Sequence, residues 1–124
     1  MEQARGHHEA ALAHYIEGLQ LHQELGDKQG MARCHLHLGA VAQAREAREG
    51  AVSHFQQSFE LSTAVGDLAG VADAASALGA LFTSLGLAEE GLEWTTRGFM
   101  GHLALGSPSA QGAVLRFPEH RFVR

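Results

Sequence analysis

The sequence of 124 residues contains little that would cross-link the chain or interrupt it. Its single cysteine, Cys34, excludes an intrachain disulfide bond, which fits a reducing compartment. Both prolines, Pro108 and Pro118, follow residue 105, so no proline breaks a helix before that point. No run approaches the roughly 18 apolar residues of a membrane span, and the N-terminus lacks the apolar segment of a signal peptide. These absences predict a cytoplasmic protein that does not enter a membrane.

The chain also lacks an excess of basic residues. Its net charge is −5 with histidine neutral, whereas surfaces that bind nucleic acid are basic. We therefore expect no nucleic-acid partner. Only the last stretch is basic, because Arg116, Arg121 and Arg124 stand there against Glu119 alone. A hydrophobic content of 45% is enough to form a core and is not typical of a disordered chain.

The strongest feature that is present is an internal repeat. The heptapeptide GDKQGMA at residues 26–32 returns as GDLAGVA at residues 66–72, and Leu38-Gly39 returns as Leu78-Gly79. The same 40-residue shift aligns small residues (Gly18, Ser58 and Gly98) and, one position later, bulky residues (Leu19, Phe59 and Phe99). A period of this length indicates an array of similar structural units.

Within each period, apolar residues recur at the spacing of an α-helix. Leu12, Tyr15, Ile16 and Leu19 fall at positions i, i+3, i+4 and i+7, which places them on one face. The pattern predicts five helices, at residues 4–25, 28–44, 48–65, 68–85 and 88–105.

The repeated heptapeptide itself marks corners between helices. Glycine ends a helix in the left-handed conformation, and the aspartate after it caps the next helix, so Gly26-Asp27 and Gly66-Asp67 are predicted corners. Gly106-Ser107-Pro108 has the form of a third corner. The run AREAREG at residues 44–50 contains no turn residue before its final glycine, so the sequence defines that turn poorly.

Four of the glycines inside the predicted helices need a reason, because each costs about 0.5–1 kcal/mol relative to alanine. They are Gly18, Gly39, Gly79 and Gly98. We expect close approach between helices at these positions, because a side chain there would hold the neighbouring helix away.

The repeated pattern of leucine, glycine, aromatic and small residues resembles the tetratricopeptide repeat over about residues 4–106. The family pattern of Leu-Gly in helix A and small, aromatic and small residues in helix B is matched by Leu38-Gly39, Ala51, Phe55 and Ser58. Less complete matches are Leu78-Gly79, Gly91, Thr95 and Gly98, and, before them, Ala11, Tyr15 and Gly18. The 40-residue period is similar to the long-period variant of spindle-orientation G-protein adaptors, kinesin light chains and many bacterial signalling regulators.

The resemblance implies an all-α fold in which helix-turn-helix repeats stack as a right-handed superhelix. Residues 1–106 would form the array, as one helix B followed by two full helix A/helix B repeats. Residues 107–124 would form a C-terminal tail, either an aborted third repeat or a cap, because Pro118 falls where Leu-Gly is expected.

The resemblance also implies a function, which is the binding of a partner peptide or helix in the concave groove lined by the A helices. The chain would then be a non-enzymatic scaffold or adaptor. The groove positions would be Arg33, Leu36, Ala40, Gln43, Asp73, Ser76, Ala80 and Thr83. The basic clamp of chaperone-tail binders is missing, and the chain has no asparagine for an asparagine ladder. An apolar or weakly polar helix is the partner that this composition favours.

Other functions stay open from the sequence. One alternative is that the array is a regulatory, sensor or structural section of a larger signalling protein. A metal protein based on the nine histidines is a weaker alternative, because no two are three or four residues apart, although helix assembly could bring His14 and His54 together. Cys34 lies on an apolar stripe and is predicted to pack rather than react. We predict no catalytic residue, metal or cofactor.

The first predicted helix carries an apolar stripe, formed by Leu12, Ile16 and Leu19, but no helix A precedes it in this sequence. Terminal repeats of such arrays need polar outer faces. We therefore expect either self-association through the apolar terminal helices or a place within a longer array.

Overall fold

A computed structural model of the chain describes residues 2–105, with the side chains of residues 2–6 left aside. It contains helices α1 (Glu2–Leu25), α2 (Lys28–Ala44), α3 (Arg48–Val65), α4 (Leu68–Ser84) and α5 (Ala88–Ala104). All regular structure in residues 2–105 is helical, which confirms the predicted all-α class. The five predicted helices agree with these bounds to within two residues. The predicted corner at Gly106 and the tail at residues 107–124 lie outside the described residues.

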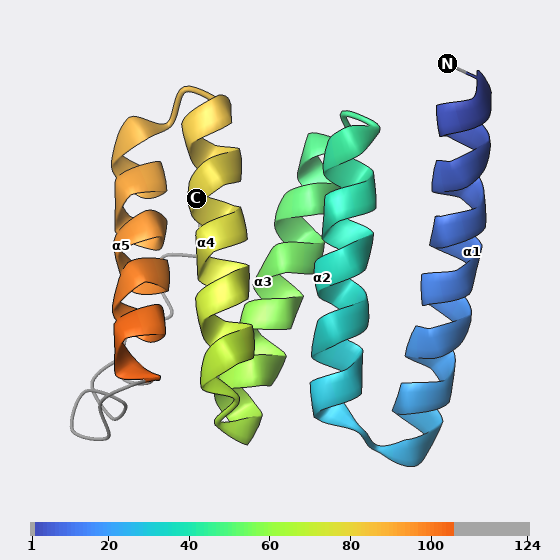
Figure 1. The fold of residues 1–124 in the computed structure, drawn as a ribbon, viewed down its shortest axis with the longest axis horizontal. Coiled ribbons are helices and arrows are strands. Elements are labelled where there is room, and N and C mark those ends of the chain that lie inside the picture. Colours follow the sequence, from blue (N-terminus) through green and yellow to red (C-terminus); the bar gives the residue numbers. More distant parts are fainter. Residues whose placement is uncertain (1, 106–124) are drawn as a thin grey trace.

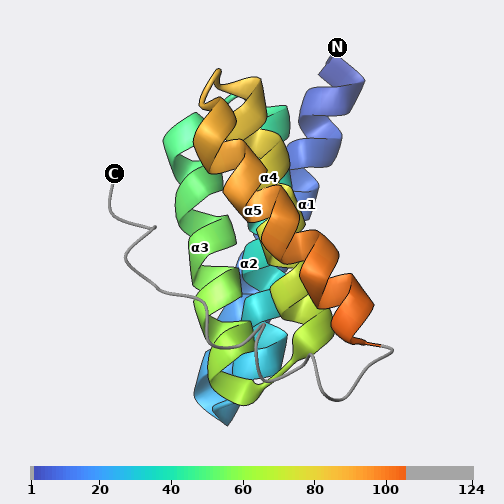
Figure 2. The same ribbon diagram turned by 90° about the vertical axis from the view of Figure 1, so that its left-hand side faces the viewer.

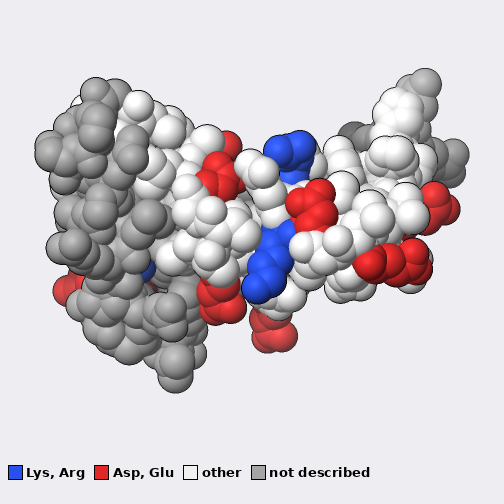
Figure 3. Space-filling view, turned by 90° about the horizontal axis from the view of Figure 1, so that it is seen from below, with Lys and Arg blue, Asp and Glu red and all other residues white. Residues whose placement is uncertain are grey.

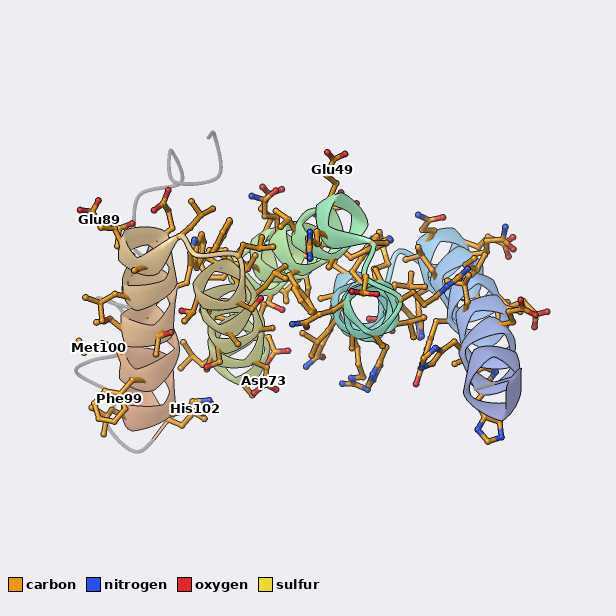
Figure 4. The ribbon with its side chains drawn as sticks, turned by 90° about the horizontal axis from the view of Figure 1, so that it is seen from above. Glu49, Asp73, Glu89, Phe99, Met100 and His102 are labelled. Atoms are coloured by element: carbon orange, nitrogen blue, oxygen red, sulfur yellow. The ribbon has the colours of Figure 1, made fainter. Side chains whose placement is uncertain are left out.

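The helices lie side by side in chain order, from α1 at one end to α5 at the other (Figure 1). Each helix contacts the next one along the chain, and α2 also contacts α4. Seen from above, α2 and α4 lie on one side of the assembly and α3 on the other (Figure 4). In the view along the stack, α5 lies in front of α4, with α3 to one side of both (Figure 2). The arrangement brings two helices that are not consecutive, α2 and α4, together on one surface.

Two of the predicted corners are confirmed. Gly26 and Gly66 adopt left-handed conformations, with φ of +68° and +71°. The Asp27 carboxylate accepts a hydrogen bond of 3.0 Å from the backbone N–H of Gly30 at the start of α2. The Asp67 carboxylate likewise accepts a hydrogen bond of 3.2 Å from the backbone N–H of Gly70, the third residue of α4. Each aspartate therefore satisfies one of the free N–H groups of the helix that it begins.

The turn that the sequence defined poorly, between α2 and α3, places Glu46 in the left-handed region with φ of 59°. Forty residues later, the turn between α4 and α5 places Gly86 in the same region with φ of 81°. The two turns thus have the same form, although only one has the glycine that this conformation favours.

The core is centred on α3, α4 and α5. Its largest fully buried side chains include Phe55, Leu78, Leu81 and Trp94. The rings of Phe59 and Trp94 meet edge to face with their centroids 5.0 Å apart, which links α3 to α5. Cys34 is also buried, as its position on the apolar stripe predicted.

Interior glycines mark close contacts between helices, as expected. A Cβ on Gly39 would lie 2.5 Å from the ring of Phe55, and one on Gly79 would lie 2.7 Å from the backbone nitrogen of Thr95. A Cβ on Gly98 would lie 3.0 Å from the backbone nitrogen of Ser76 in α4. Gly18 is looser, because its Cβ would stand 3.4 Å from the sulfur of Cys34, an ordinary contact distance. The expectation therefore holds for three of the four glycines.

Candidate functional site: a pocket between α2 and α4

A pocket of about 190 Å³ lies where the N-terminal halves of α2 and α4 come together. One wall belongs to α2 and the other to the N-terminal part of α4, while Ser58 and Ser62 of α3 lie between them. We call it the α2–α4 pocket. Its lining residues are Gln29, Ala32, Arg33, Leu36, Ser58, Ser62, Asp67, Ala69, Gly70 and Asp73.

Three of the eight predicted groove residues line this pocket, namely Arg33 and Leu36 from α2 and Asp73 from α4. Ala40, Gln43 and Ala80 are exposed farther along the two helices and do not line it.

The two remaining predicted groove residues, Ser76 and Thr83, lie next to α5. A Cβ on Gly98 would meet the side chain and backbone of Ser76, and one on Gly91 would meet those of Thr83. Ser76 is half-buried, whereas Thr83 is exposed. The structure therefore brings these two residues to the α4–α5 contact rather than to the α2–α4 pocket.

Polar contacts tie the two walls of the pocket together. The side-chain amide of Gln29 donates a hydrogen bond of 3.2 Å to Asp67, whose other carboxylate oxygen caps α4. Asp67 thus holds the start of α4 to the first turn of α2. Ser62 is fully buried, and its hydroxyl has no hydrogen-bond partner within residues 2–105.

The rim of the pocket carries charges of both signs. Arg33 and Asp73 are both exposed, one on each wall. Asp73 also faces α5, where the ring nitrogen of His102 lies 4.0 Å from its carboxylate (Figure 4). Seen from below, basic side chains lie near the middle of the molecule with acidic ones on both sides of them (Figure 3). A ligand in the pocket would therefore meet a mixed apolar and polar lining, with a cation on the α2 wall and carboxylates on the α4 side.

Sequence reasoning missed several lining residues, chiefly Gln29, Ser62 and Asp67. Asp67 was assigned only a capping role, although a cap at a corner also lies at the end of the groove. Ser58 appeared in the column of small residues, and Ser62 lies one helical turn beyond it, so that column did carry a signal for the pocket floor. Nothing in the sequence pattern links Gln29 to Asp67.

The histidine that meets His54 is His35 rather than His14. Their Nδ1 atoms are 3.0 Å apart across the contact of α2 and α3, and their rings stack with centroids 5.3 Å apart. Burial lowers the pKa of both imidazoles, and the neighbouring charge of His54 lowers the pKa of His35 further. In the described part of the chain, no group of three or more His, Cys, Asp or Glu could hold a metal ion.

The single thiol is poorly placed for nucleophilic chemistry. Burial raises the pKa of Cys34, which keeps its sulfur protonated and weakly nucleophilic at neutral pH. Asp27 differs, since the hydrogen bond from the Gly30 N–H is the main cause that lowers the pKa of its carboxyl group, helped by His22. The ring nitrogen of His22 lies 3.0 Å from that carboxylate, which joins the end of α1 to the start of α2.

Comparison with models of protein families, with curated proteins and with solved structures finds no match for this chain. Within residues 2–105, no helix has both the length and the apolar character needed to cross a membrane.

Proposed function

We propose that this chain is a non-enzymatic protein-interaction module of the tetratricopeptide type, whose helices form a right-handed superhelical stack. A segment of a partner protein would bind in the α2–α4 pocket and along the surfaces of those two helices. The observation that carries the proposal is that one pocket is lined by Arg33 and Leu36 of α2 and by Asp73 of α4. These two helices begin 40 residues apart in the sequence, and all three residues belong to the predicted groove.

The lining suggests the chemistry of the partner segment. Ala32, Leu36 and Ala69 offer an apolar surface that favours an apolar side chain, because burial of such surface contributes about 25 cal/mol per Å². Arg33 and Asp73 on opposite walls favour a segment with an acidic and a basic or polar group on its two sides. The pocket is too small to enclose a whole helix, so a single anchoring side chain would enter it and the remaining contacts would be superficial.

The proposal can be tested by selection of short peptides from a display library on the full chain. Counter-selection against the double variant Arg33→Glu/Asp73→Lys removes peptides that bind elsewhere. Affinities of the selected peptides are then measured by calorimetry for the unmodified chain, for Arg33→Glu and for Arg48→Glu as a matched control.

We expect Arg33→Glu to weaken binding by about tenfold or more, since a charge next to the anchor is reversed. Arg48→Glu, which makes the same charge change outside the pocket, should change the affinity by less than about twofold. The proposal would be contradicted if counter-selection removed every peptide that binds the unmodified chain, or if no peptide were selected at all.

A further inference from the structure

Two phenylalanines that occupy the same position of the repeat have opposite environments. Phe59 of α3 and Phe99 of α5 are separated by 40 residues, which is the repeat period. Phe59 is 4% exposed, whereas Phe99 is 63% exposed. Phe99 and its neighbour Met100 point away from α4, on the outer side of the stack (Figure 4).

The difference extends along a whole face of α5. Leu92, Thr96, Phe99 and Leu103 fall at positions i, i+4, i+7 and i+11, so they share one face, and all four are exposed. We call them the α5 stripe. Their counterparts in α3 are Val52, Gln56, Phe59 and Thr63, each of which is buried or half-buried. The α5 stripe therefore corresponds to a face of α3 that neighbouring helices cover, whereas in α5 the same face is exposed.

The cover of the α3 face includes α4, which packs there through small and apolar residues. Val71, Ala74, Ala75 and Leu78 of α4 are buried in the same core as Phe59. Gly70 lies directly against Ser62, at a distance that leaves no room for a Cβ. Beside the α3 face there is therefore a capped amphipathic helix with glycine at a close contact, and Trp94 of α5 adds an edge-to-face contact with Phe59.

From this equivalence we infer that the α5 stripe binds a further amphipathic helix, supplied by another polypeptide, with the small and apolar contact residues of α4. The next residues of this chain are a poorer source. Between Pro108, at the first helical position after the predicted corner, and the helix breaker Pro118 there is room for a helix of only about ten residues, against 17 residues in α4. This second binding surface is separate from the α2–α4 pocket and does not depend on the function proposed for it.

A peptide with the sequence of residues 67–85 is the probe, since it carries α4 and its aspartate cap. A hydrocarbon staple between positions 80 and 84, both exposed in α4, keeps the isolated peptide helical. Its binding to the full chain is followed by fluorescence anisotropy. The control peptide carries Val71→Glu and Leu78→Glu, which place charges on its contact face.

We expect the α4 peptide to bind and the control peptide not to bind. Phe99→Glu in the chain should weaken binding by about tenfold or more, whereas Leu25→Glu, on the equally exposed end of α1, should change it by less than about twofold. Absence of binding, or binding that Phe99→Glu leaves unchanged, would overturn the inference.

The other candidate occupants give different results in the same experiment. If residues 107–124 cover the α5 stripe, Phe99→Glu will lower the melting temperature of the chain alone and the peptide will not bind. If a second copy covers it, light scattering will show a dimer that Phe99→Glu dissociates. In either case the occupant would be this chain's own tail or a second copy of this chain, and not a helix of a different protein.

Discussion

His35 of α2 and His54 of α3 meet through their Nδ1 atoms at 3.0 Å. One of these nitrogens must carry a proton and the other must lack it, because a hydrogen bond needs one donor and one acceptor. His35 is buried and His54 is half-buried, so a second positive charge would be poorly solvated there. Arg45 lines the same pocket as His54.

This pair predicts how stability depends on pH. The pKa of each imidazole is lowered in the folded chain, so the unfolded chain binds more protons once the pH falls below about 6.5. The contribution of this pair to the free energy of unfolding should therefore be constant above that pH and decrease as the pH is lowered from there through the folded pKa values. Urea denaturation between neutral pH and pH 5 measures this decrease.

Replacement of the pair tests its source. His35→Gln should flatten the decrease between neutral pH and pH 5, since it removes one of the two coupled groups. His7→Gln, which changes an exposed histidine in α1, should leave the pH profile as it is. An unchanged profile in His35→Gln would show that the loss of stability in acid comes from other groups.

The two equivalent turns predict a stabilising substitution. Glu46 holds the left-handed conformation that Gly86 holds in the next repeat, and a side chain in this region costs about 1–2 kcal/mol. Glu46→Gly should raise the free energy of unfolding by about 0.5–1 kcal/mol after the extra entropy of glycine in the unfolded chain is included. Gly86→Ala should lower it by a similar amount. Chemical denaturation measures the free energy of unfolding of both variants. A change of the same sign in the two variants would contradict the prediction.

The contact between α4 and α5 predicts a severe effect from one added methyl group. A Cβ on Gly79 would lie 2.7 Å from the backbone nitrogen of Thr95, and a backbone atom cannot move aside as a flexible side chain can. Gly79→Ala should lower the free energy of unfolding by about 1–3 kcal/mol in spite of the better helix propensity of alanine. Gly50→Ala is the matched control, because its Cβ would have 3.8 Å of clearance from Ala42. It should be neutral or slightly stabilising, and equal effects at both sites would refute the packing argument.

The buried hydroxyl of Ser62 at the α2–α4 pocket predicts a second substitution that stabilises the fold. Ser62 is fully buried and its hydroxyl has no hydrogen-bond partner in residues 2–105. Ser62→Ala removes that polar atom and improves helix propensity, so we expect the free energy of unfolding to rise by about 0.5–1 kcal/mol. Thr63→Ala serves for comparison, since the Thr63 hydroxyl donates a 2.8 Å hydrogen bond to the Phe59 carbonyl. A loss of stability in Ser62→Ala would mean that the hydroxyl has a function in the fold.

The number, type and bounds of the helices were predictable because they depend on local chemistry. An apolar stripe at helical spacing marks each helix, and a glycine followed by an aspartate marks two of the corners. The turn at Glu46 was harder to predict because its left-handed residue is not a glycine. The conformation there follows from the packing of α2 against α3, which outweighs the local preference of glutamate.

The candidate site was predicted only in part. Arg33, Leu36 and Asp73 could be assigned to a shared surface because the repeat fixes which side each residue takes on its own helix. The repeat does not fix how far a groove extends, and the structure limits the pocket to the N-terminal halves of α2 and α4, above Ser58 and Ser62 of α3. Ser76 and Thr83 instead lie where α5 approaches α4 so closely that glycines face them.

Sequence alone therefore determined five helices, two of their corners and three of the close contacts between helices, since each depends on the conformational preferences of a few neighbouring residues. Only the tertiary structure decided that His54 pairs with His35, that Asp67 bonds to Gln29, and that Phe59 is covered while Phe99 is not. These relationships depend on the distance and angle between whole helices. Such geometry results from the summed packing of many side chains and is not encoded in any one segment.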